Sequence, residues 1–176
     1  MNRKKIETKR NLIHINNNCV IREYPYPEYL QLFENCKLYY EKIKNNKYVP
    51  NFEFFENKII QTYCGKTLKD QNLNIETKDL IKIQIIDFIN LIFNEKIAHR
   101  DFHIKNICWD GSQIWVIDWE FIIKHEPNNI LKHYDVTGVG LPSPFLSGNM
   151  NVFKNHKLSV VNWLKPIKLE IEELLI

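Results

Sequence analysis

Three oxygen-bearing side chains, Asp101, Asn106 and Asp118, are the residues of this chain best suited to carry chemistry. Asp101 and Asn106 are five residues apart in a polar segment, and Asp118 follows twelve residues later, at the end of an apolar run. Amide and carboxylate oxygens are ligands that Mg²⁺ prefers, and it keeps several waters when bound. A second carboxylate nearby can orient a nucleophile. The set therefore suits phosphoryl transfer, in which positioning and charge neutralisation do most of the work.

A hairpin between these residues is expected to bring them together. Asp110-Gly111 is a strong turn signal, and it lies between the apolar runs 107–109 and 115–117. If the two runs pair, Asn106 and Asp118 lie side by side just outside the pairing, and the loop carries the remaining carboxylate close to them. The alternative is that these Asp and Asn residues only form turns and caps, as they do in most loops.

The order of these residues resembles the catalytic loop and the metal loop of the protein-kinase-like superfamily. His99-Arg100-Asp101, followed by Asn106, matches the catalytic loop, here residues 99–106. Asp118-Trp119-Glu120 stands where the metal loop begins, here residues 118–120. This triplet and His103 are more similar to choline kinases and aminoglycoside phosphotransferases than to protein kinases, which usually have lysine at the position of His103.

The resemblance implies a role for each matched residue. Asp101 would accept or orient the proton of a substrate hydroxyl, and Asn106 and Asp118 would hold Mg²⁺ against the phosphates of ATP. His103 stands where related enzymes direct a side chain toward the transferred phosphate, and the alternative is a hydrogen-bonding surface group in a loop. Lys105 is interpreted as a solvated residue, with a contact to phosphate as the alternative.

The first 64 residues are predicted to form a small lobe, an antiparallel sheet with one helix. An amphipathic pattern predicts the helix over residues 27–44, and its Pro27-Glu28 start suits a first helical turn. The basic segment 1–10 is expected to be a solvated tail. Four β-prone runs are predicted to pair as two hairpins, over residues 12–15, 19–23, 52–55 and 58–63.

Strands, a helix, more strands and a glycine-containing connection resemble the small lobe of a kinase and its hinge. The resemblance implies that Tyr63 and Cys64, in the connection, meet the adenine of ATP through their backbone. It also places Arg22 where kinases carry a phosphate-binding lysine, with Glu34 or Glu41 of the helix as its partner. The alternative for Arg22 is an exposed position on an edge strand.

Residues 65–176 are predicted to form a reduced, mainly helical second lobe. A helix with apolar residues almost all round is expected over 77–96, leading into His99, which by resemblance braces the loop. Two short helices are expected over 157–164 and 169–175. The tryptophans near the metal loop are most simply core residues. The whole chain, 1–176, is thus predicted to be a single α+β domain with a bilobal, kinase-like fold.

Composition is that of an ordinary soluble globular protein, with 44% hydrophobic and 26% charged residues. The net charge of +3 is mild, and no basic stripe with interleaved aromatic residues argues for nucleic acid. Polar residues interrupt the most apolar segment, so no membrane span is expected. Four scattered cysteines and the lack of a secretory signal make a reducing cytoplasm the expected location.

Two functions fit the sequence. The first is an ATP- and Mg²⁺-dependent phosphotransferase that moves the terminal phosphate of ATP to a hydroxyl of a small molecule, a lipid head group or a protein. The alternative is a pseudokinase, a binding module that keeps the fold and acts by contacting a partner. The alternative is supported by Arg22 in place of lysine and by the absence of glycine before Gly65, which removes the usual glycine-rich loop over the phosphates.

Overall fold

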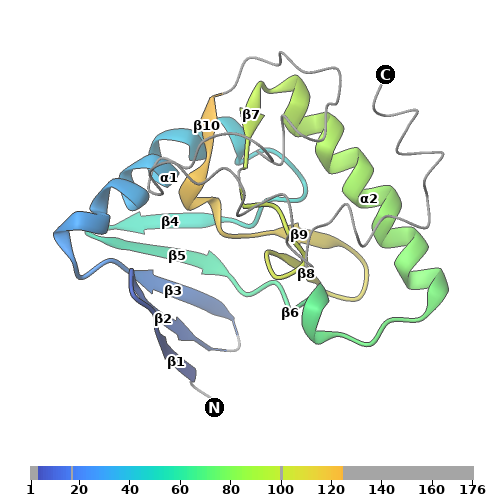
Figure 1. Cartoon of the computed structure of the whole chain (residues 1–176), viewed down its shortest axis with the longest axis horizontal. Coiled ribbons are helices and arrows are strands. Elements are labelled where there is room, and N and C mark those ends of the chain that lie inside the picture. The colour runs from blue at the N-terminus through green and yellow to red at the C-terminus, as the bar shows by residue number, and fades with distance from the viewer. Residues whose placement is uncertain (1–3, 17, 100, 125–176) are drawn as a thin grey trace, which may run out of the picture.

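The computed structural model describes residues 4–16, 18–99 and 101–124 (Figure 1). Within these ranges the chain forms a five-stranded antiparallel sheet, two α-helices and two smaller sheets. The described residues therefore have an α+β structure, as the sequence predicts. The helices predicted over 157–164 and 169–175 lie outside the described residues.

The large sheet has the strand order β1-β2-β3-β5-β4, with every neighbouring pair antiparallel. Both predicted hairpins are confirmed, β2 with β3 and β4 with β5. The helix between them is also confirmed. The strands are β1 (Lys4–Glu7), β2 (Leu12–Ile15), β3 (Cys19–Glu23), β4 (Phe52–Phe55) and β5 (Lys58–Thr62).

The prediction of a solvated tail over residues 1–10 is wrong for the part that forms β1. This strand pairs with β2 from Lys4 opposite Ile15 to Glu7 opposite Leu12. Its side chains are nevertheless mostly exposed. Charged residues on an edge strand discourage pairing with other chains, so a basic segment can belong to a sheet without an apolar pattern.

Helix α1 (Leu30–Ile43) follows a 3₁₀ turn at Pro27–Tyr29, which confirms the predicted start at proline. It buries one face, made by Leu32, Phe33, Cys36 and Ile43. Tyr40 on the same helix accepts a hydrogen bond from the backbone N–H of Phe52 in β4, at 2.9 Å. The helix is therefore fixed to the large sheet by apolar packing and by a hydrogen bond between a tyrosine side chain and the backbone of β4.

A linker at residues 63–65 leads from β5 into a three-stranded sheet of β6 (Lys66–Thr67), β8 (Ile107–Trp109) and β9 (Ile114–Val116). Gly65 has φ +86°, and a Cβ built on it would lie 2.7 Å from the carbonyl oxygen of Trp109. Only glycine therefore permits this close approach between the linker and β8.

The hairpin of β8 and β9 forms with a register one residue away from the predicted one. Ile107 pairs with Val116, whereas the predicted pairing places it opposite Ile117. The reason is a four-residue turn: the side chain of Asp110 accepts hydrogen bonds from the backbone of Ser112 and Gln113, both at 2.8 Å. The side chain of Asp110 thus stabilises a loop, residues 110–113, that is one residue shorter than the predicted one.

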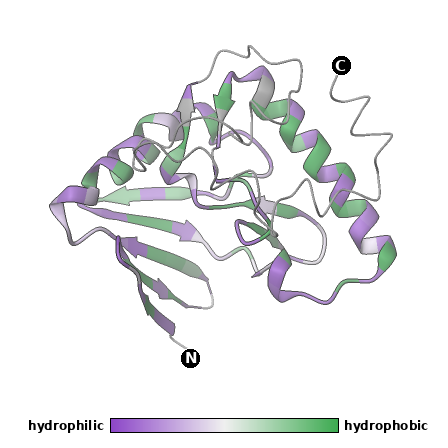
Figure 2. Cartoon of the chain, in the orientation of Figure 1, coloured by the Kyte–Doolittle hydropathy of each residue, from purple (hydrophilic) through white to green (hydrophobic). Residues whose placement is uncertain are grey.

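Helix α2 (Ile75–Asn94) leads into β7 (Ile97–Ala98), which pairs with β10 (Ile123–Lys124). The sequence suggests that α2 is buried on almost all sides. In the structure it is not, because Ile83 is 64% exposed. The buried stripe is Ile81, Ile85, Phe88, Ile89 and Ile92. Figure 2 shows hydrophobic segments both along α2 and on the strands of the large sheet. None of the helices in the described ranges combines the length and apolarity needed to cross a membrane.

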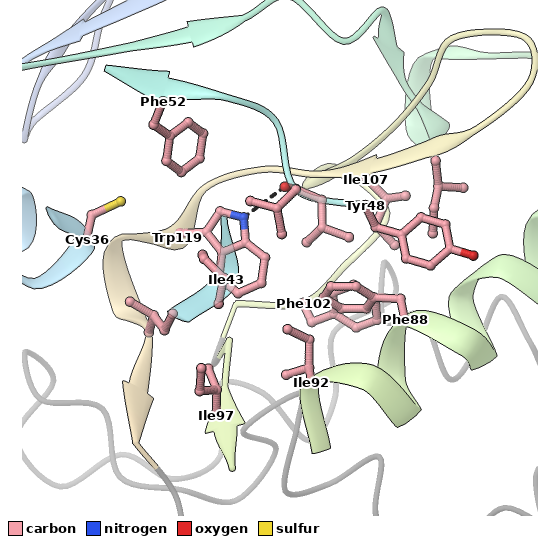
Figure 3. Packing of buried hydrophobic residues seen from close by; sticks show 14 of the residues in the cluster. Cys36, Ile43, Tyr48, Phe52, Phe88, Ile92, Ile97, Phe102, Ile107 and Trp119 are labelled. Carbon is pink, nitrogen blue, oxygen red and sulfur yellow. Dashed lines mark hydrogen bonds between the residues drawn. The ribbon is translucent and has the colours of Figure 1, made fainter. Parts of the chain in front are cut away.

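The core runs without interruption from α1 to α2, with Trp119 at its centre (Figure 3). Trp119 is 1% exposed, and its ring packs edge-on against Phe88 of α2 and against His99. Its indole N–H donates to the carbonyl of Val116 at 2.8 Å. The prediction of Trp119 as a core residue is confirmed, and its burial fixes the backbone on either side of it.

The linker glycine gives a test of this arrangement. Because φ strain and a clash with a backbone oxygen combine at Gly65, we expect Gly65→Ala to lower the free energy of unfolding by about 2–4 kcal/mol. Gly111→Ala is the matched control, since φ there is +110° but nothing lies within 4 Å of the added Cβ. Its effect should be strain alone, about 1–2 kcal/mol. Urea unfolding measures both, and equal losses would contradict the close approach at Gly65.

Candidate active site

Two loops meet at one end of the β8–β9 hairpin. The backbone N–H of Ile117 donates to the carbonyl of Asn106 at 2.9 Å, directly beyond the first residue pair of the hairpin. The end of the loop 99–106 therefore lies beside the start of the loop 118–120. The predicted meeting of the two loops is confirmed, although Asn106 lies opposite Ile117 rather than opposite Asp118.

Asp101 and Asn106 are in direct contact. The amide nitrogen of Asn106 donates to the backbone carbonyl of Asp101 at 2.9 Å and to its carboxylate Oδ2 at 3.0 Å. The backbone N–H of Asn106 donates to the carbonyl of His103 at 2.8 Å. Asn106 is buried. These contacts fix the amide group, and the remaining amide oxygen is the atom that would bind a hard cation.

Asp101 is held as a carboxylate. His103 Nε2 lies 3.3 Å from Asp101 Oδ1, on the opposite oxygen from Asn106. Burial raises the pKa of Asp101, but the contacts with His103 and Asn106 lower it more, so the net pKa lies below its ordinary value. An ionised carboxylate can accept a hydrogen bond from a hydroxyl and orient it.

His99 joins the two loops, as the resemblance implies. Its Nε2 lies 3.0 Å from the carbonyl of Ile117, and its Nδ1 accepts the backbone N–H of Asp101 at 3.2 Å. These partners require the proton on Nε2 and leave no place for one on Nδ1. The ring is fully buried, and burial lowers the pKa of His99 although Asp101 and Asp118 work to raise it. His99 is therefore a neutral brace.

Asp118 occupies a left-handed turn between β9 and the 3₁₀ turn Trp119–Phe121. Its backbone has φ +67° and ψ +58°, a conformation that Asp tolerates better than most residues. The buried ring of Trp119 follows directly. The left-handed residue lets the chain turn while Trp119 enters the core and the carboxylate of Asp118 stays accessible, with its side chain 24% exposed.

Arg22 of β3 contacts two carboxylates of the loop 118–120. Its Nη1 lies 2.5 Å from Asp118 Oδ1 and 2.5 Å from Glu120 Oε1. The alternative of an exposed arginine on an edge strand is wrong, because β3 lies between β2 and β5 and the Arg22 side chain is 14% exposed. Burial opposes its charge, but Asp118 and Glu120 outweigh burial and raise the pKa of Arg22.

The predicted partner of Arg22 on the helix is also wrong. Glu34 is exposed, and Glu41 forms an ion pair with Lys44 instead. The cause is the orientation of α1, whose buried face includes Leu32 and Phe33, so that Glu34 projects away from the sheet. The negative charges that balance Arg22 therefore come from the loop 118–120 rather than from the helix.

Glu120 is the functional candidate that sequence reasoning missed. It is buried, and its Oε1 also accepts hydrogen bonds from Tyr24 at 2.7 Å and from the amide of Asn11 at 2.8 Å. Burial and the charge of Asp118 raise the pKa of Glu120, while Arg22 opposes them. The sequence does contain a signal for Glu120, because it directly follows a tryptophan that is predicted to be in the core. An acidic residue buried beside such a tryptophan needs charged or hydrogen-bonding partners.

The residues predicted to bind the rest of the nucleotide lie in the linker and in the loop 99–106. Tyr63 is an exposed linker residue whose backbone N–H donates to Asn18 at 3.0 Å. Cys64 is buried, and burial raises the pKa of its thiol to about 12. Lys105 is exposed in the loop 99–106. Contact of these three residues with a nucleotide stays a prediction.

The donor set fits Mg²⁺ only as an ion shared with a ligand. Within the ranges that the structure describes, no three His, Cys, Asp or Glu side chains are grouped to hold a metal. Mg²⁺ often binds through one or two protein oxygens together with waters and substrate phosphates. Asn106 and Asp118 have side chains of that chemical type, one amide and one carboxylate, and a cation at Asp118 would compete with Arg22.

No family model matches the chain, and no curated protein matches it significantly. The chemistry of the site therefore has to be judged from its own geometry.

The neutral brace predicts a dependence of stability on pH. Because His99 has a lowered pKa when folded, the unfolded chain binds its proton more readily, and stability falls as pH drops below about 6.5, by at most about 1.4 kcal/mol per pH unit. We expect His99→Gln to flatten this slope. Urea unfolding between about pH 5 and pH 8 measures it in both proteins, so that any contribution of Glu120, whose pKa is raised, is common to the two slopes.

His14→Gln is the matched control, because it removes one histidine from β2 without touching the loops. Equal flattening in both variants would show that the slope does not come from His99.

Proposed function

We propose that this protein is a kinase-type phosphotransferase, which uses ATP and Mg²⁺ to phosphorylate a hydroxyl group on a small molecule, a lipid head group or a protein. One observation carries the proposal: two loops held together by His99 place Asp101, bonded to Asn106, beside the segment in which Asp118 faces Arg22. Acceptor activation, cation binding and phosphate binding each have a candidate side chain within this one region.

The order of the elements supports a bilobal, kinase-like fold. A five-stranded sheet with a helix inserted before β4 comes first, as expected for a lobe of residues 1–64. The linker then leads to α2, the loop 99–106, the β8–β9 hairpin and the loop 118–120, in the order expected for a second lobe from residue 65. Arg22 lies on the strand before the inserted helix, the position that the resemblance assigns to a phosphate-binding cation.

In this proposal each side chain has a physical task. Asp101, held ionised by its neighbours, accepts the hydrogen bond of the acceptor hydroxyl and aligns it for attack. Asn106 and Asp118 hold the cation, which when bound neutralises charge on the phosphates. Arg22 offers further N–H donors to phosphate oxygens, for which a guanidinium is well suited.

The turn between β1 and β2, residues 8–11, stands in for a glycine-rich loop. Thr8 closes it by accepting the backbone N–H groups of Arg10 and Asn11, at 3.1 and 3.0 Å. Arg10 Nη1 lies 3.6 Å from Glu120 Oε2, and its side chain is 43% exposed. The turn therefore brings a cationic side chain to the metal loop, where a kinase would offer backbone N–H groups to phosphates.

A second candidate function is a binding module without turnover, and one observation favours it. Arg22 already contacts both Asp118 and Glu120, so the charges of this cluster are balanced inside the protein without any ligand. A protein that used the fold only to contact a partner would need no more than this. The two candidates differ in whether ATP is consumed.

Removing the proposed hydroxyl-orienting group separates the candidates. We expect Asp101→Asn to lower Mg²⁺-dependent ATP consumption by about 10²- to 10⁴-fold, the usual contribution of such a group, while ATP binding changes little. Asp79→Asn is the matched control, because Asp79 is an exposed residue of α2 paired with Lys82. A coupled assay with a panel of hydroxyl acceptors measures turnover. ATP binding without turnover in the wild type as well as in both variants would favour the binding module.

The cation site gives an independent test. We expect ATP with Mg²⁺ to raise the melting temperature of the wild type more than ATP alone, because the ion links the phosphates to Asp118. In Asp118→Asn the additional shift caused by Mg²⁺ should vanish, since a carboxylate ligand is lost. Thermal unfolding with and without the ion measures this, and Asp79→Asn should keep the full shift. A retained shift in Asp118→Asn would place the ion elsewhere.

A further inference from the structure

We infer that Glu120 is the positioning residue of Arg22: its buried carboxylate, rather than a glutamate of α1, directs the guanidinium toward the phosphates of the nucleotide. The inference rests on the proposed function and deepens it, because it assigns the origin of the phosphate-binding geometry. It also joins the β1–β2 turn to the same carboxylate.

Glu120 is built into the protein as a fixed group. Its Oε1 lies 2.5 Å from Arg22 Nη1, 2.7 Å from the hydroxyl of Tyr24 and 2.8 Å from Asn11 Nδ2. The residue is only 2% exposed. A carboxylate is strongly destabilising in such a position unless donors surround it, and here three donors converge on one oxygen. Its position is thus determined from several sides.

Asp118 is the contrasting partner of the same guanidinium. It also lies 2.5 Å from Arg22 Nη1, but its side chain is 24% exposed against 3% for Glu120. Water screens an accessible ion pair more than a buried one. When Asp118 turns to a cation, Glu120 still holds Arg22. One carboxylate can then serve the ion while the other keeps the arginine in place.

Helix α1 acts on this arrangement through the loop backbone. Asn35 Nδ2 donates to the carbonyl of Glu120 at 2.9 Å and to the carbonyl of Ile122 at 2.7 Å. Glu34, the residue before it, is exposed. The helix therefore fixes the segment that carries Glu120, and Glu120 in turn fixes Arg22. The ion pair that the sequence predicts between helix and strand is replaced by this indirect path.

The β1–β2 turn is held by the same carboxylate. Asn11 donates to Glu120 Oε1, and Arg10 Nη1 lies 3.6 Å from Oε2 and stacks over the Phe121 ring at 5.0 Å. Phosphates that contact Arg10 or Arg22 would therefore meet two cations that are both held by the carboxylate of Glu120. This arrangement suits a polyanion such as the triphosphate of a nucleotide.

A mutant cycle on nucleotide affinity tests the inference. We expect Glu120→Gln and Arg22→Lys each to weaken Mg²⁺-ATP binding about tenfold, as when a charge-assisted hydrogen bond is lost, and the double variant to weaken it no more than about tenfold. Glu34→Gln is the matched control and should bind as the wild type does. In the Glu34→Gln background, Arg22→Lys should keep its full effect. Isothermal titration calorimetry gives the affinities.

Additive losses from Glu120→Gln and Arg22→Lys would overturn the inference, because independent effects mean that Glu120 does not act through Arg22. The inference would also be overturned if the effects of Glu34→Gln and Arg22→Lys on affinity were non-additive. A loss of binding caused by general unfolding is recognised by circular dichroism. In that case Glu120→Asp, which keeps the charge on a shorter side chain, replaces Glu120→Gln and should show the same coupling to Arg22.

A readout without nucleotide separates this inference from the proposed function. The guanidinium resonances of Arg22, assigned through Arg22→Lys, report by NMR whether rotation of the group is restricted. We expect restriction in the wild type and in Glu34→Gln, and averaged resonances in Glu120→Gln. If the wild type does not bind ATP, the proposed function fails, and these spectra still decide what holds Arg22. Unchanged Arg22 resonances in Glu120→Gln would overturn the inference.

Discussion

The ion pair between Arg22 and the carboxylates of the loop 118–120 is the interaction on which the arrangement of the site depends. It joins the middle of the large sheet to a loop that follows β9, across 96 residues of sequence to Asp118 and 98 to Glu120. Buried charges are tolerated only when partners are close, so neither side can move away without leaving a charge uncompensated. The large sheet and the loops after α2 are thus held to one relative position by electrostatics as well as by the core around Trp119.

The site combines groups of two kinds, and burial separates them. His99 and Glu120 are buried and satisfied by neighbouring backbone or side chains, so they fix the loops. Asp101 and Asp118 keep part of their surface accessible to ligand. Proteins that carry out chemistry on polyanions need both kinds, because reactive groups must stay open while their geometry is fixed from behind.

Local patterns allowed most of the described fold to be predicted, because hairpins and amphipathic helices are encoded in neighbouring residues. The two hairpins of the large sheet, the helix that starts at Pro27 and the bracing role of His99 are found where they are expected. Side-chain pairing across long distances was not predictable in the same way. The rotation of α1 decides whether Glu34 faces the sheet, and that rotation depends on core packing rather than on local sequence. The register of the β8–β9 hairpin likewise depends on the turn that Asp110 organises.

The two candidate functions make different demands on the charges of the site. Arg10 and Arg22 meet Asp118 and Glu120, so charges of each sign balance within that cluster, and a binding module would require nothing further. Asp101 does not take part in this balance. It is held by His103 and by the neutral amide of Asn106, and these contacts lower its pKa despite its burial. A partly buried carboxylate kept ionised in this way is ready to orient an acceptor hydroxyl, which a binding module does not need, and it therefore supports the proposal of a phosphotransferase.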